Sequence, residues 1–132
     1  MTTPLAALLD TLLPGDADWP AAGTLEGVVE QVAADAAPAP LLAALPAGFA
    51  TADAESREAA LRALEAAEPA AFERLVVAAY LAYYTHDPVR AVLERLTGYA
   101  AHPPQPLGYE LPPFDESLLE TQRKRAPFWR DA

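Results

Sequence analysis

Apolar residues recur along this chain at the spacing of helices and almost nowhere with the alternation of strands. The first group, residues 5–12, has leucines at i, i+3, i+4 and i+7, which is one face of a helix. Thr3 is placed to cap this helix, and Pro4 suits its first turn. The turn residues at 14–16 then end it. The pattern predicts a short amphipathic helix at this end of the chain.

Three more helices are predicted before residue 68. A stripe over residues 25–32 follows Thr24, which we expect to be its N-cap. Prolines around residues 41–45 leave room there for one or two helical turns. A longer helix is predicted from Asp53, its N-cap, to Ala67. Its inward positions are expected to be Ala60, Leu61, Leu64 and Ala67.

The helix predicted from Ala70 to Thr85 is apolar on almost every side. Only Glu73 and Arg74 are charged in it. Its apolar residues form two stripes, the first of Phe72, Leu75, Val76, Ala79, Tyr80 and Tyr83 and the second of Val77, Leu81 and Tyr84. A helix that is apolar all round is usually buried. We therefore expect this helix to form the centre of the core.

A further helix is predicted after Asp87, its expected cap, with Pro88 at the first position. Its apolar stripe consists of Val89, Val92, Leu93 and Leu96, and Gly98 suits its C-terminal end.

The last part of the chain is rich in proline and lacks the regular helical spacing of the preceding segments. Five prolines between residues 102 and 114 argue against a helix and favour an extended arm. A short helix is predicted over 115–125, with Leu118 and Leu119 facing inward. We therefore expect an all-α fold, a small bundle of about five to six short helices with an extended proline-rich C-terminal arm. The helical domain is predicted at 1–101, and the arm, short helix and aromatic tail at 102–132.

Composition narrows the classes of function. The 132 residues are the size of one domain, and the absence of cysteine excludes disulfides, thiolate metal sites and a cysteine nucleophile. The formal charge of −10 argues against nucleic acid or an anionic membrane as a partner. Residues 1–68 hold eleven acids and two bases, whereas residues 69–132 hold eight acids and seven bases. The second half is therefore almost neutral.

Residues that could carry catalysis or bind a metal are few. His86 precedes Asp87, but adjacent residues rarely face one another and Asp87 is already explained as a helix cap. Asp16 and Asp18 flank a turn without the ligand pattern of a calcium loop, and glycine-rich phosphate loops are absent. We therefore expect no catalytic, cofactor-binding or metal site in this chain. A small enzyme built around His86 and Asp87 remains an alternative.

Aromatic residues gather in the second half. Eight of the eleven lie between Tyr80 and Trp129, several of them in or beside the arm and tail. Aromatic and arginine side chains on an extended segment suit a chain that anchors in the pockets of a partner. The predicted partner interface is Tyr99, Tyr109, Phe114, Phe128, Trp129 and Arg130. The alternative is that the arm covers its own helices.

Three segments resemble one family. They are residues 8–23 (LLDTLLPGDADWPAAG), 82–99 (AYYTHDPVRAVLERLTGY) and 103–130 (PPQPLGYELPPFDESLLETQRKRAPFWR). In this order they are similar to the small (gamma) subunit family of gluconate 2-dehydrogenase and related sugar dehydrogenases, also described as gluconate 2-dehydrogenase subunit 3-like. Tyr83, Tyr84, Asp87 and Gly108 match the family pattern, and we expect them to be structural.

The resemblance implies a noncatalytic subunit without a cofactor of its own. Its implied partner is a large oxidoreductase of the glucose-methanol-choline type, which holds FAD and oxidises a sugar or polyol. A cytochrome c subunit for electron transfer completes some of these complexes. The chain lacks the twin-arginine leader of many family members, so we expect a cytoplasmic complex, or a periplasmic one if a leader was removed. The rival hypothesis is a free-standing helical adaptor or regulator that homodimerises without an oxidoreductase partner.

Overall fold

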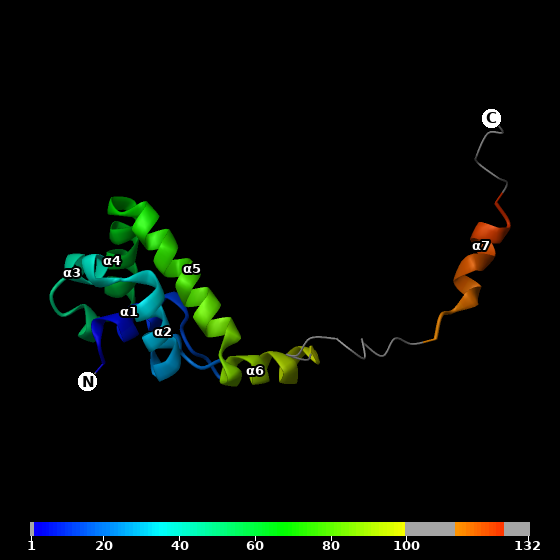
Figure 1. The fold of residues 1–132 in the computed structure, drawn as a ribbon, viewed down its shortest axis with the longest axis horizontal. Helices are drawn as coiled ribbons and strands as arrows, with labels where there is room; N and C mark the ends of the chain where they lie inside the picture. Colours follow the sequence, from blue (N-terminus) through cyan, green and yellow to red (C-terminus); the bar gives the residue numbers. More distant parts are fainter. Residues whose placement is uncertain (1, 100–112, 126–132) are drawn as a thin grey trace, which may run out of the picture. The chain divides into compact units, whose positions relative to one another are not determined.

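The computed structural model describes residues 2–99 and 113–125. The chain divides into two compact units, Met1–Ala101 and His102–Ala132. The described residues form seven α-helices and three short 3-10 turns, and none of them lies in a strand (Figure 1). This confirms the predicted all-α class. Of the predicted arm at 102–114, all but Pro113 and Phe114 lies outside the described residues.

Helix α1, Pro4–Leu12, lies at the centre of the core of unit 1. As predicted, the Thr3 hydroxyl accepts a hydrogen bond from the Ala6 N–H and Pro4 opens the helix. All residues from Leu5 to Leu9 are buried, because α1 contacts α2, α4 and both the 3-10 turns of this unit. These turns are Ala22–Thr24 and Phe49–Thr51.

Gly23 brings the first of these turns directly against α1. A Cβ at this position would lie 2.1 Å from the Ala6 carbonyl oxygen, so only glycine fits. The Asp10 carboxylate accepts a hydrogen bond of 2.6 Å from the Gly23 N–H and fixes the approach.

Helices α2, Glu26–Ala36, and α3, Ala39–Ala44, follow. The short α3 agrees with the predicted one or two turns. The prediction that Thr24 caps α2 is wrong. Thr24 ends the preceding 3-10 turn and its hydroxyl donates to the Ala21 carbonyl, so Leu25 becomes the N-cap without a side-chain bond.

Helix α4, Ala54–Ala67, begins as predicted, with the Asp53 carboxylate accepting a hydrogen bond of 2.7 Å from the Ser56 N–H. Leu61 and Leu64 are buried and Ala60 is half-buried, as expected. Ala67 is exposed, so its predicted inward position is wrong: it is the last residue of the helix, directly before the turn into α5.

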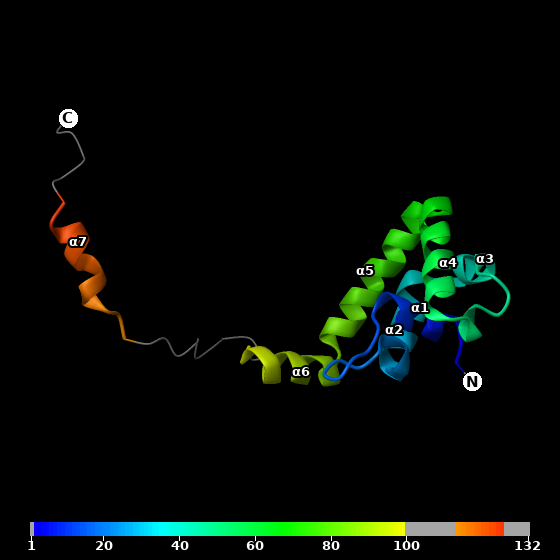
Figure 2. The ribbon, with the colours of Figure 1, turned by 180° about the vertical axis from the view of Figure 1, so that it is seen from behind.

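Helix α5, Pro69–Thr85, is the longest helix among the described residues, and it lies along one edge of unit 1 (Figures 1 and 2). Its buried residues are Phe72, Leu75, Ala79, Ala82 and Tyr83, which face α2 and α4. The prediction that α5 is the buried centre is therefore wrong. Only one of its two apolar faces is covered, because the core is organised around α1.

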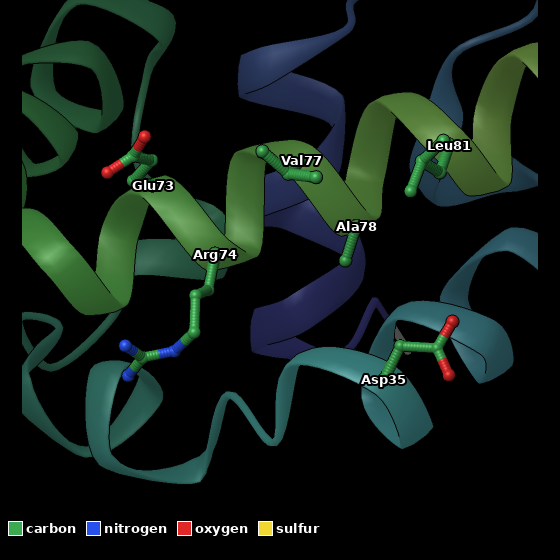
Figure 3. Close-up of a pocket in the computed structure, with 6 residues that line it drawn as sticks. All are labelled: Asp35, Glu73, Arg74, Val77, Ala78 and Leu81. Carbon is green, nitrogen blue, oxygen red and sulfur yellow. The ribbon is translucent and has the colours of Figure 1, made fainter.

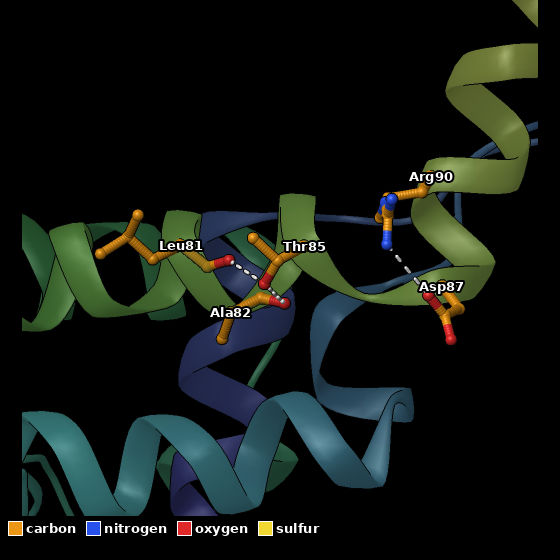
Figure 4. A network of polar contacts seen from close by, with 5 residues as sticks. All are labelled: Leu81, Ala82, Thr85, Asp87 and Arg90. Carbon is orange, nitrogen blue, oxygen red and sulfur yellow. Dashed lines mark hydrogen bonds and ion pairs between the residues drawn. The ribbon is translucent and has the colours of Figure 1, made fainter. Parts of the chain in front are cut away.

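Helix α6, Asp87–Thr97, ends as predicted at Gly98, whose φ of 70° is the left-handed conformation that glycine tolerates. The predicted cap is wrong by one residue. His86 is the N-cap, and the Asp87 carboxylate lies within the first turn, 3.3 Å from the Arg90 guanidinium (Figure 4). Along the predicted stripe, Val89 is buried whereas Leu96 is 47% exposed.

In unit 2 the described residues form the 3-10 turn Glu116–Leu119 and helix α7, Glu120–Arg123. The Asp115 carboxylate caps this segment by accepting from the Ser117 N–H. Leu119 is half-buried but Leu118 is 69% exposed, so the predicted inward orientation of Leu118 is wrong. Within 113–125 this single helical segment has no second layer on which Leu118 packs.

Across the described part of the chain, no helix combines the length and the apolar character that crossing a membrane requires.

Candidate interaction surface

An apolar stripe on α5 is exposed. It consists of four residues at helical spacing, Val77, Tyr80, Leu81 and Tyr84, with exposed fractions of 52%, 48%, 60% and 49%. We call these four residues the α5 stripe. Single exposed apolar residues are ordinary, whereas four large side chains along one helix face form an apolar patch, a feature that is common at interaction sites.

The aromatic rings of the stripe are ordered by their neighbours. Tyr80 and Tyr84 stack with ring centroids 6.0 Å apart and planes 1° apart. Tyr84 also meets the buried ring of Tyr83 edge to face at 5.2 Å. The Tyr83 hydroxyl donates a hydrogen bond of 2.8 Å to the Pro20 carbonyl, so the ring at the base of this group is fixed. The rings therefore present a preorganised surface.

A groove borders the stripe on the side of α2. It is lined by Asp35, Glu73, Arg74, Val77, Ala78 and Leu81, and Figure 3 shows Asp35 on α2 across from Ala78 on α5. Val77 and Leu81 belong to both the groove and the stripe, so the two features form one surface. Charged side chains at the groove surround an apolar centre, which is the usual anatomy of a protein interface.

The end of α5 leads directly into α6. The Thr85 hydroxyl donates to the Leu81 carbonyl at 2.6 Å, within the helix (Figure 4). Further along, the Arg95 guanidinium of α6 donates to the Asp18 carboxylate at 2.8 Å, which ties α6 to the loop after α1. This ion pair is half exposed, so its contribution is to orientation more than to stability.

The residues predicted as the partner interface are only partly described. Tyr99, in unit 1, is 64% exposed, and Phe114, in unit 2, is 66% exposed. Both are available for contact. The other four, Tyr109, Phe128, Trp129 and Arg130, lie outside the described residues.

The predicted interface included none of the four residues of the α5 stripe. Val77, Leu81 and Tyr84 were identified as the second stripe of the Ala70–Thr85 helix, and Tyr80 was assigned to the first, but an apolar stripe alone does not distinguish a buried face from an exposed one.

The structure shows no hydrogen bond between the His86 ring and the Asp87 carboxylate. The Asp87 carboxylate contacts Arg90, and the His86 ring lies against Gly27, where an added Cβ would be 3.1 Å from Nε2. His86 Nδ1 is buried, and no described residue makes a hydrogen bond to it. Within residues 2–99 and 113–125, no cluster of histidine and carboxylate side chains has the arrangement of a metal site.

Comparison with known proteins yields no similarity: no family model, no curated protein and no solved structure matches the chain.

Proposed function

We propose that this chain is a noncatalytic accessory subunit that binds and stabilises a larger FAD-dependent oxidoreductase of the glucose-methanol-choline type, acting on a sugar or polyol. The observation that carries the proposal is the exposed α5 stripe. The partner class rests on the resemblance of residues 8–23, 82–99 and 103–130 to the small-subunit family. FAD belongs to the partner, and this chain contributes binding surface.

The stripe has the chemistry of an interface centre. Tyrosine is enriched among the residues that dominate binding energy, and two of the four stripe residues are tyrosines. Burying an aliphatic or aromatic side chain contributes roughly 25 cal/mol for each Å² of apolar surface removed from water. The stacked rings lose little conformational freedom on binding, so more of this energy is available for association.

The negative charge of unit 1 indicates which charge the partner surface should carry. Unit 1 holds fourteen acidic and five basic residues, so it attracts a surface that is basic around an apolar patch. The compartment of the complex is set by whichever subunit carries an export signal. A further electron-transfer subunit would bind the oxidoreductase.

Co-expression tests the proposal. The chain is produced with a candidate FAD-dependent oxidoreductase of the glucose-methanol-choline type, and the FAD content and soluble yield of the large subunit are compared with and without the chain. We expect co-purification and a higher yield of FAD-loaded enzyme. A chain truncated after Ala101 measures how much of the binding comes from residues 102–132. A chain that purifies alone as a homodimer and leaves the oxidoreductase unchanged would contradict the proposal and favour a free-standing adaptor.

A further inference from the structure

A second pocket lies beside the α5 stripe and has a different chemistry. It has a volume of about 170 Å³ and is lined by Leu13, Pro14, Asp16, Trp19, Tyr83 and Tyr84. For comparison, a cavity of about 150 Å³ accommodates benzene. Three aromatic rings and one carboxylate thus line a space that is wide enough for one flat group. We call it the aromatic pocket.

The loop that forms one wall of the pocket is held by its own hydrogen bonds. Asp16 Oδ1 accepts from the N–H groups of Asp18 and Trp19, each at 2.8 Å, and the Asp16 N–H donates to the Trp19 carbonyl at 2.9 Å. Gly15 allows this tight turn, since a Cβ there would lie 2.6 Å from the Ala21 nitrogen. The hydrogen bond from Tyr83 to Pro20 joins the loop to α5. The pocket is therefore preorganised.

The Asp16 carboxylate at the pocket is negatively charged, and one of its two oxygens accepts no hydrogen bond from the described residues. The Trp19 N–H, and next the Asp18 N–H, hold the pKa of Asp16 below its ordinary value, so the group is ionised at neutral pH. Both N–H bonds go to Oδ1, and Oδ2 accepts from none of the described residues. The neighbouring cation, Arg95, pairs with Asp18.

We propose that the aromatic pocket binds an arginine side chain presented by the partner protein, next to the apolar patch that covers the α5 stripe. A guanidinium is planar and stacks on aromatic rings, while its N–H groups donate to a carboxylate. Tyr84 belongs to both the pocket and the stripe, so one partner surface reaches both. The negative charge of unit 1 favours the approach of a cation. The inference rests on the proposed function for the identity of the partner, but the pocket chemistry is independent of it.

Other side chains fit less well. A lysine ammonium is attracted to the same rings but is strongly hydrated and cannot stack as a plane. An apolar side chain would fill the space without compensating Asp16 and would remove water from its carboxylate. Arginine combines planar stacking on the rings with several N–H groups that donate to the carboxylate.

The test uses the full chain and three capped tripeptides, acetyl-Gly-X-Gly-amide, in which X is arginine, lysine or citrulline. Citrulline has nearly the shape of arginine without its charge. Trp129→Phe leaves Trp19 as the single indole, whose N–H resonance is followed by NMR during each titration. We expect saturable shifts with the arginine peptide and a dissociation constant in the millimolar range, which suits one side chain. The lysine peptide is expected to bind several-fold more weakly, and the citrulline peptide to cause no saturable shift.

Two variants test whether the negative charge at the pocket, rather than a change in folding, determines arginine binding. Asp16→Asn keeps an oxygen that accepts the turn hydrogen bonds but removes the charge, and it is expected to weaken arginine binding about threefold or more. Glu65→Gln removes one negative charge from an exposed position on α4, outside both the aromatic pocket and the groove, and is expected to leave binding unchanged. Circular dichroism verifies that both variants fold. Equal binding of the arginine and citrulline peptides, or unchanged binding by Asp16→Asn, would overturn the inference.

The inference and the proposed function fail in different ways. If the arginine peptide does not bind while the oxidoreductase still co-purifies with the chain, the inference is wrong and the function stands. If the peptide binds as expected and no oxidoreductase associates, the pocket chemistry stands and the partner class is wrong.

Discussion

The Tyr83 hydroxyl joins helix α5 to the loop that follows α1. Its hydrogen bond to the Pro20 carbonyl spans 63 residues of sequence and orders the loop that forms the aromatic pocket. We expect Tyr83→Phe to lower the free energy of unfolding by about 1 kcal/mol, since it leaves the Pro20 carbonyl without this donor. Tyr84→Phe is the matched control, because the structure gives its hydroxyl no such bond. Urea denaturation measures both, and an equal effect would contradict this role of Tyr83.

Tyr83 also makes stability depend on pH at the alkaline end. Burial, with smaller contributions from Tyr84 and Asp16, raises its pKa above the ordinary value of 10.0. The neutral phenol is therefore favoured in the folded state. Its contribution is fully present below pH 10 and is lost as the pH rises through the raised pKa. We expect the free energy of unfolding to fall over this range in the wild-type chain and to fall less in Tyr83→Phe. The same decline in both proteins would exclude Tyr83 as the group responsible.

The two threonines that were predicted as caps differ in their environment. Thr3 caps α1, whereas the Thr24 hydroxyl donates to a turn carbonyl. We expect Thr3→Ala to cost about 1 kcal/mol of stability and Thr24→Ala to cost less. Thermal denaturation compares them. A larger loss for Thr24→Ala would mean that the 3-10 turn holds the fold more strongly than the α1 cap does.

Local signals account for what the sequence predicted well at this scale. Thr3, Asp53 and Gly98 act within one turn of their own position, and all three were predicted correctly. Thr24 was misassigned because Gly23 packs on α1, which turns the chain into a 3-10 conformation before α2 starts. That approach depends on residues far apart in sequence, so no local pattern reveals it.

At the scale of elements, α5 has one buried face and one exposed apolar face, and we propose that the exposed face binds the partner. Leu75 is fully buried, so we expect Leu75→Ala to cost about 2–5 kcal/mol. Leu81 is 60% exposed, so Leu81→Ala should change stability by less than about 0.5 kcal/mol. Chemical denaturation of the isolated chain measures both. A large loss with Leu81→Ala would show that Leu81 packs within the folded chain and would remove it from the interface.

The same helix shows where periodicity stops being informative. Both stripes of α5 were visible in the sequence, but which one is covered depends on where α2 and α4 pack. The burial of α1 was underestimated for the same reason, since a nine-residue helix with four leucines gives no sign that four elements surround it. Helix positions follow from local chemistry, whereas burial is a property of the assembled core.

For the whole molecule, the division of charge and of apolar surface points to association. The acidic residues lie mostly in unit 1, on helices whose apolar faces build the core around α1. Four of the large apolar side chains that this unit exposes lie together in the α5 stripe. A buried core together with an exposed apolar face is what the proposed role of an accessory subunit requires.

The central claim is that the α5 stripe binds the oxidoreductase, and the affinity of the complex tests it most directly. The dissociation constant is measured by calorimetry for the wild-type chain, for the double variant Val77→Ser, Leu81→Ser, and for Leu96→Ser, which removes an exposed leucine from α6. We expect the double variant to bind roughly thirty-fold or more weakly, since two residues at an interface centre together cost about 2 kcal/mol or more. Leu96→Ser should bind like the wild-type chain. A double variant that folds and binds with unchanged affinity would contradict the claim.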